Sequence, residues 1–339
     1  MIPRTQNRMC LTWMTLGCII SLSASDGSLG DTPLEVSEQA YLQTPPVVIS
    51  ATQLVQPVSE APASVTVIDR SAIAAMGARN IPELMRRVVG VTVAYENGSN
   101  PVVSYQGLNS GLSKRMQVLV DGRSVYNPFF GGVLWESLPL ELEDIERIEF
   151  VRGPNAAIDG ANAFLATINI KTRHSSEDQG LHAKTRIGNN GMGEGYLRYG
   201  GVHDTLSYRF SGAYNQDYGL DTRNDNVRGR YLSGRVDWNI TPTHSITALA
   251  GYKASDLGQG FQTQRFSILK NPFEACFPEH NRNIGNYFGQ LRFDSMPSPD
   301  RQTTLQLYYE RVTSLADYPL NPRCGGVNKQ DDYFPSFAQ

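Results

Sequence analysis

The clearest pattern in the sequence is an alternation of apolar and polar residues with a period of two, which begins after Gly180. Such alternation predicts β-strands with one apolar and one polar face. Seven runs of this kind predict strands over residues 181–188, 194–200, 205–215, 229–239, 245–254, 286–294 and 302–312. Strands of about ten residues with this alternation are typical of transmembrane barrels with a water-filled lumen. A soluble β-sandwich alternates in the same way, so the pattern alone leaves both architectures open.

The connections between these predicted strands differ in length. Residues 216–228 and 255–285 form long connections, whereas 240–244 and 295–301 are short and contain proline. In outer-membrane barrels, short turns face the periplasm and longer loops face outward. The alternation of long and short connections therefore favours a barrel. It also predicts that the first strand runs outward, so that the chain enters the barrel from the periplasm.

Residues 62–173 have a different pattern, which predicts a compact unit of short strands and helices. Asp69 and Asn80 stand where their side chains can cap helices that begin at Arg70 and Ile81. Strands are predicted over residues 64–68, 91–95, 102–105, 116–120, 148–151 and 167–171. This mixture of short elements predicts an α+β domain ahead of the alternating strands.

Two further segments precede this domain. Residues 1–25 have the pattern of an export signal, with a basic start, an apolar run over 9–20 and small residues before the expected cleavage site. The apolar run is too short for a membrane-spanning helix, which needs roughly 20 residues. Residues 26–61 are expected to be a flexible periplasmic tail that contains the β-prone run 47–51. An isolated run of this kind is suited to pairing with the sheet of a partner, and a plain first strand of the next domain is the alternative.

Composition and charge narrow the possible functions. The 339 residues carry 30 Lys and Arg against 33 Asp and Glu, a net charge of −3, and this balance does not favour a nucleic-acid partner. The five histidines are scattered, and the sequence shows neither a nucleophile elbow nor a dinucleotide-binding glycine motif. We therefore expect no enzymatic activity, no cofactor and no metal site. Cys276 and Cys324 both fall in predicted external loops, where they could form a disulfide.

Several motifs between residues 46 and 175 resemble, in order, those of TonB-dependent outer-membrane receptors. The run from Glu146 to Pro154 (ERIEFVRGP), followed by GANA at 160–163 and INIKT at 168–172, resembles the end of the plug domain of that family. The run VLVDGR at 118–123 resembles the central strand and turn of the plug. Ahead of these motifs, a short run resembles the TonB box, and its residues are Val47, Val48, Ile49, Ser50 and Ala51.

This resemblance implies a plug domain over 62–175, followed over 180–339 by the first strands of an incomplete transmembrane β-barrel. A barrel of this family has about 22 strands, so seven strands cannot close it. We therefore expect a truncated or partial form, or the relic of a receptor, that does not transport alone. The complete receptor is expected in the outer membrane of a Gram-negative bacterium, where it would import a scarce ligand, with a ferric siderophore ahead of cobalamin or haem. Its partners would be that ligand and TonB with the inner-membrane energising complex.

The resemblance also implies functional residues. The plug loops expected to face the ligand contribute Tyr95, Glu96, Asn97, Ser99, Asn100, Tyr126, Asn127, Phe129, Phe130 and Trp135. For Phe129, Phe130 and Trp135, packing inside the plug is the alternative. Arg152 resembles the arginine that anchors the plug to barrel carboxylates, whereas Gln106 stands where the family often has a second arginine.

Two other functions are conceivable within the same class of protein. A signalling receptor would carry an additional folded domain between the export signal and the TonB box, and the tail has too few residues for one. A non-transporting binding protein or porin would lack the plug motifs. Both are less consistent with the sequence than ligand uptake.

Overall fold

A computed structural model describes residues 47–48, 56–57, 61–97, 100–107, 114–128, 131–220, 224–259, 280–298 and 301–316. Every described residue belongs to one unit, Pro45–Gln339. The predicted export signal, most of the predicted tail, and both Cys276 and Cys324 lie outside the described residues.

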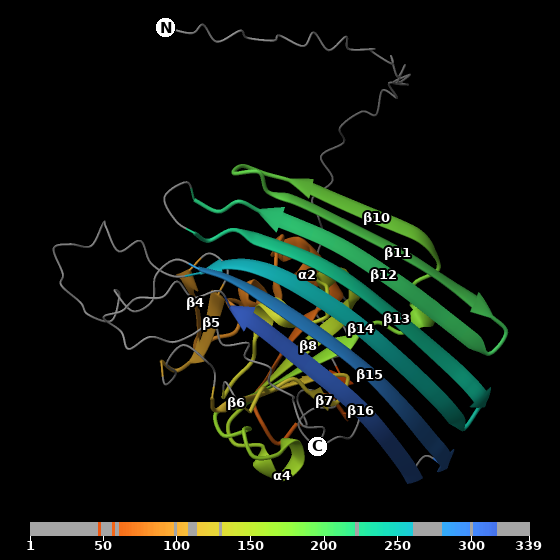
Figure 1. Cartoon of the computed structure of the whole chain (residues 1–339). Coiled ribbons are helices and arrows are strands. Elements are labelled where there is room, and N and C mark those ends of the chain that lie inside the picture. The colour runs from red at the N-terminus through yellow and green to blue at the C-terminus, as the bar shows by residue number, and fades with distance from the viewer. Residues whose placement is uncertain are drawn as a thin grey trace, which may run out of the picture. The chain divides into compact units, whose positions relative to one another are not determined.

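The first part of this unit is an α/β domain built on a five-stranded mixed sheet (Figure 1). The strand order is β3 (Val65–Asp69), β8 (Ile145–Arg152), β9 (Ala166–Thr172), β6 (Met116–Val120) and β7 (Arg123–Ser124). Strands β6 and β9 are parallel, and the other pairs are antiparallel. A separate hairpin joins β4 (Val91–Asn97) to β5 (Asn100–Tyr105), and β1 (Val47–Val48) pairs with β2 (Gln56–Pro57).

Short helices connect these strands, and their boundaries follow from capping residues. Asp69 accepts a hydrogen bond of 2.8 Å from the backbone N–H of Ala72 and caps α2 (Arg70–Met76). Hydrogen bonds from Ser71 and from the backbone at Ala72 hold the pKa of Asp69 below its usual value. Asn80 caps α3 (Ile81–Met85) by accepting a bond of 3.0 Å from Glu83 N–H. These caps confirm the two predicted helix starts.

The remaining short elements are α4 (Ala156–Asp159) and three 3-10 turns, η2 (Trp135–Ser137), η3 (Leu142–Asp144) and η4 (Ser175–Glu177). An apolar core lies within the α/β domain, and its fully buried members include Ile68, Leu84, Phe150 and Ile168. None of the helices in the described residues has the length and the apolar character that a membrane-crossing helix needs.

The second part is one antiparallel sheet of seven strands in sequence order, here called the strand wall (Figure 1). Its strands are β10 (Gly180–Ile187), β11 (Gly193–His203), β12 (Leu206–Asp217), β13 (Val227–Thr241), β14 (His244–Gln259), β15 (His280–Ser298) and β16 (Arg301–Ala316). All seven predicted strands are present. The later strands are longer than predicted, because their alternation continues beyond the predicted strand ends. The predicted connection 255–285 therefore narrows to 260–279.

The two faces of the strand wall differ in the way that the alternation predicts. Trp238 is 43% exposed, whereas its neighbour Asp237 is 2% exposed. Phe210 and Arg209 form the same contrast on β12. Large apolar side chains thus cover one face of the sheet, while the polar face contacts the α/β domain. An exposed apolar face of this extent is unusual for a soluble protein and is expected of a sheet that faces lipid.

Candidate functional site

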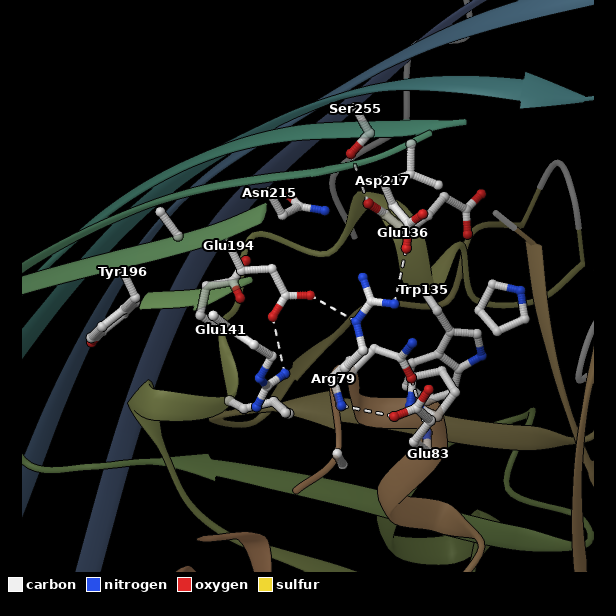
Figure 2. A pocket seen from close by; sticks show the side chains of 18 of the residues that line it. Arg79, Glu83, Trp135, Glu136, Glu141, Glu194, Tyr196, Asn215, Asp217 and Ser255 are labelled. Carbon is white, nitrogen blue, oxygen red and sulfur yellow. Dashed lines mark hydrogen bonds and ion pairs between the residues drawn. The ribbon is translucent and has the colours of Figure 1, made fainter. Parts of the chain in front are cut away.

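A cavity of about 410 Å³ lies between the α/β domain and the strand wall. It is at the end of the wall where the connections 218–226 and 260–279 leave the sheet, because its wall residues include Glu194 at the start of β11 and Asp217 at the end of β12. Figure 2 shows side chains from both parts pointing into it. A cavity of this volume is within the range of small-molecule sites.

Arg79 connects the two sides of the cavity. It lies between α2 and α3, and its guanidinium forms ion pairs with Glu194 at 2.8 Å and with Asp217 at 2.9 Å (Figure 2). Arg186 of β10 also binds Glu194, at 2.9 Å. Burial opposes the charge of Arg79, but the two carboxylates outweigh burial and raise the pKa of the guanidinium. This cluster fixes the α2–α3 link against strands β11 and β12.

The start of helix α3 forms a second part of the cavity. The amide of Asn80 donates a hydrogen bond of 2.9 Å to the hydroxyl of Tyr95, which in turn lies 3.2 Å from Glu83. The other carboxylate oxygen of Glu83 accepts a bond of 2.7 Å from the backbone N–H of Arg79. Burial raises the pKa of Tyr95 and keeps its hydroxyl protonated. Tyr95 therefore presents its ring to the cavity with the hydroxyl already bound.

Turns η2 and η3 supply the third part. The backbone carbonyl of Glu136 accepts a bond of 2.9 Å from Ser255, and Glu141 pairs with Lys253 at 3.3 Å. Burial raises the pKa of both carboxyl groups, Glu136 and Glu141. Oε1 of Glu136 is buried and has no hydrogen-bond partner among the described residues. Trp135 lines the cavity and is only 6% exposed.

The structure places the predicted ligand-facing residues in three groups. Tyr95 and Trp135 line the cavity, and Trp135 also belongs to the apolar core, as the alternative for it stated. The structure does not bring Asn100, Tyr126 and Asn127 to the cavity. Instead, the backbone of Asn127 pairs with Gly132. The other predicted positions lie outside what the structure describes of side chains, namely Glu96, Asn97, Ser99, Phe129 and Phe130. Ligand contact at these positions stays a prediction.

The predicted TonB box is described only in part. Val47 and Val48 form strand β1, whereas Ile49, Ser50 and Ala51 lie outside the described residues. The extended backbone at Val47–Val48 is compatible with strand pairing to a partner.

Buried polar contacts also attach the α/β domain to the wall. Asp144 is 1% exposed and accepts hydrogen bonds from Tyr196 at 2.8 Å and from Tyr231 at 2.7 Å. Arg209 lies 3.5 Å from Asp144 and pairs with Asp178 at 2.7 Å. Arg123 forms an ion pair with Glu310 of β16. Because each contact buries charge at the interface, removing one partner would leave the other uncompensated.

Arg152, the predicted anchor, lies elsewhere. Its guanidinium donates to Ser64 at 3.0 Å and to Thr66 at 2.6 Å, both within the α/β domain. It also lies 5.9 Å from the ring centroid of Phe150. Its pairing with a barrel carboxylate stays a prediction. The described contacts to the wall come from other residues, which the sequence does not mark as anchors. Arg123 has the clearest sequence signal among them, because it ends the VLVDGR motif.

Comparison with known proteins identifies the family with which this arrangement agrees. The family model for the TonB-dependent receptor plug domain matches residues 57–167. The chain is 30% identical over 272 residues to a vitamin B12 transporter of Vibrio vulnificus, which covers 77% of this chain and 42% of that protein. It is 26% identical over 267 residues to an iron-regulated outer membrane virulence protein of Vibrio cholerae, covering 72% of this chain and 37% of that protein. The chain spans less than half the length of these curated relatives.

The fold agrees with this family. A ferric citrate transporter in its unliganded form matches with a TM-score of 0.62 and 20% identity, covering 76% of this chain and 41% of that one. The alcaligin outer membrane receptor from Bordetella pertussis matches with a TM-score of 0.61 and 17% identity, covering 80% and 43%. The α/β domain is thus a plug domain, and the strand wall is part of a barrel. The chain belongs to the TonB-dependent receptors of the outer membrane.

Proposed function

We propose that this chain belongs to a receptor that imports a scarce ligand, a ferric siderophore or a cobalamin, across the outer membrane. The observation that carries the proposal is the cavity between the plug and the strand wall, at the end where the longer connections leave the sheet. In a barrel whose short turns face the periplasm, that end faces outward. A ligand that reaches the cavity from outside would therefore contact the plug and the wall together.

The plug would close the barrel until energy is supplied. Several plug side chains pair with the inner face of the wall, among them Arg79, Arg123 and Asp144. Opening a path past the plug requires these contacts to break, and such contacts are costly to break while water is excluded. TonB is the proposed source of the work, acting on the extended segment at Val47–Val48 by strand pairing.

The names of two relatives support the choice of ligand classes. One relative is named a vitamin B12 transporter and another is named iron-regulated. The corresponding experiment is growth of a strain that lacks its own receptors for these ligands, under cobalamin limitation and under iron limitation. Growth that depends on this receptor under either condition is expected. No receptor-dependent growth on any cobalamin or iron(III) chelate would contradict the proposal.

A further inference from the structure

The cavity between the plug and the wall carries an unequal set of charges. Among the described residues, seven carboxylate side chains and four cationic side chains line it. Both the plug and the wall contribute carboxylates, so the excess does not belong to one element. The inference that follows rests on the proposed function, because it assumes that the cavity receives the imported ligand.

Every one of the four lining cations is already paired with a carboxylate. Arg79 binds Glu194 and Asp217, and Arg186 shares Glu194. The two lysines follow the same rule, since Lys184 pairs with Glu143 and Lys253 with Glu141. An anionic ligand would therefore meet cations whose charge is already balanced, and it would approach their carboxylate partners as well.

Three lining carboxylates have no ion pair among the described residues, namely Glu83, Glu136 and Asp225. Glu83 and Asp225 accept backbone hydrogen bonds, from Arg79 and Leu220 respectively. Glu136 differs, because its buried Oε1 has no hydrogen-bond partner among the described residues. A buried acceptor without a partner is costly, and a donor or cationic group on a ligand would satisfy it.

Aromatic side chains complete the chemistry of the cavity. Tyr95, Trp135 and Tyr214 line it together with the carboxylates. Aromatic faces attract cations and also pack against uncharged planar groups. We propose that the receptor selects uncharged or cationic ligands and discriminates against anionic ones, and that Glu136 contributes to this discrimination.

Matched ligand pairs test the proposal, because each pair shares one scaffold and differs in charge. Cyanocobalamin is compared with its monocarboxylate, in which one side-chain amide is hydrolysed. Ferrioxamine B, which carries a free ammonium group, is compared with its N-succinyl derivative, which carries a carboxylate. Binding is measured on outer membranes of cells that make the receptor, with membranes of cells that lack it as the blank. On a scaffold that binds, we expect the member without the added carboxylate to bind about tenfold more tightly.

The variant Glu136→Gln isolates one carboxylate without changing the size of the side chain. It should narrow the preference within a pair by roughly threefold, because one negative charge leaves the cavity. Asp204→Asn is the matched control, since Asp204 is 86% exposed at the short turn between β11 and β12, far from the cavity lining. It should leave the preference unchanged. A preference in Glu136→Gln equal to that of the unchanged protein would remove Glu136 from the proposal.

Three outcomes overturn the inference. Equal or tighter binding of the anionic member of a pair contradicts it directly. Binding of neither scaffold, with receptor-dependent growth on an anionic chelate such as ferric citrate, also contradicts it and leaves ligand uptake standing. An absence of any receptor-dependent growth contradicts the proposed function, and the inference falls with it.

Discussion

Arg123 of the plug and Glu310 of strand β16 form an ion pair, although 187 residues separate them in the sequence. The side chain of Arg123 is 1% exposed, and its guanidinium lies 3.9 Å from the ring centroid of Phe288. Asn286 donates a hydrogen bond of 2.9 Å to the second carboxylate oxygen of Glu310. The pair is therefore enclosed by neighbours from the wall. It attaches the β6–β7 turn of the plug to the last described strand.

Replacing Arg123 by Ala should loosen the plug in the barrel. The change leaves the carboxylate of Glu310 with little solvent and without its cation, which costs about 3–5 kcal/mol. Cells that make the variant should become more sensitive to large antibiotics that a closed barrel excludes. The double replacement Arg123→Met with Glu310→Met should be less sensitive than the single one, because neither charge is then left unpaired.

Arg152→Ala is the informative comparison for that experiment. The described partners of Arg152 are the hydroxyls of Ser64 and Thr66 within the plug, so the leak should be smaller than for Arg123→Ala. Equal leaks in the two variants would instead indicate that Arg152 anchors the plug to the barrel, as the sequence predicted. The two variants are compared by the antibiotic sensitivity of cells that make them at matched levels.

Asp144 should contribute as much to the attachment of the other side of the plug to the wall. It accepts hydrogen bonds from the hydroxyls of Tyr196, Ser211 and Tyr231, so Asp144→Ala leaves three buried donors without their acceptor. The loss should be about 3–5 kcal/mol, and Asp144→Asn should lose less because its oxygen can still accept. Hydrogen exchange of the amides in β8 measures the effect. Exchange in Asp144→Ala as slow as in the unchanged protein would show that these bonds contribute little.

Glu143 gives the attachment a defined dependence on pH. Burial would raise its pKa, but Lys184 and Arg70 outweigh burial and lower it below the ordinary value of 4.5. Folding therefore favours the charged form, so the contribution of Glu143 is complete above that value and is lost as pH falls through the lowered pKa. The difference in unfolding temperature between the unchanged protein and Glu143→Gln should be largest at pH 7 and should shrink as the pH falls below 4.5. A difference that stays constant from pH 7 into the strongly acid range would contradict this assignment.

The sequence predicts the architecture because the architecture has local signals. The strands of the wall follow from alternation, and the helix starts follow from Asp69 and Asn80, whose side chains cap the next turn. The plug–wall contacts have no such local signal. Arg79 meets Glu194 across 115 residues of sequence, and only the curvature and register of the wall decide which pairs meet. Charged residues on the inner face could be identified from the pattern, but not their partners.

Arg79→Ala separates attachment from ligand discrimination. The side chain of Arg79 is 39% exposed, so each of its ion pairs should contribute only about 0–1 kcal/mol to stability. The variant nevertheless leaves Asp217 without its ion pair and Glu194 with Arg186 alone, which should strengthen the preference for the ligand without an added carboxylate. Binding of the matched ligand pairs measures this change. An improved affinity for the anionic member would contradict the account of the cavity.

The most direct test of the account is energised uptake. Cells that make the receptor are given labelled cyanocobalamin or a labelled iron(III) chelate, with and without TonB, and surface binding and internal label are measured separately. The account predicts that binding persists without TonB while uptake stops, and that Val48→Pro has the same effect because proline removes a backbone donor from the extended segment. Receptor-dependent uptake that continues at the same rate without TonB would contradict the account.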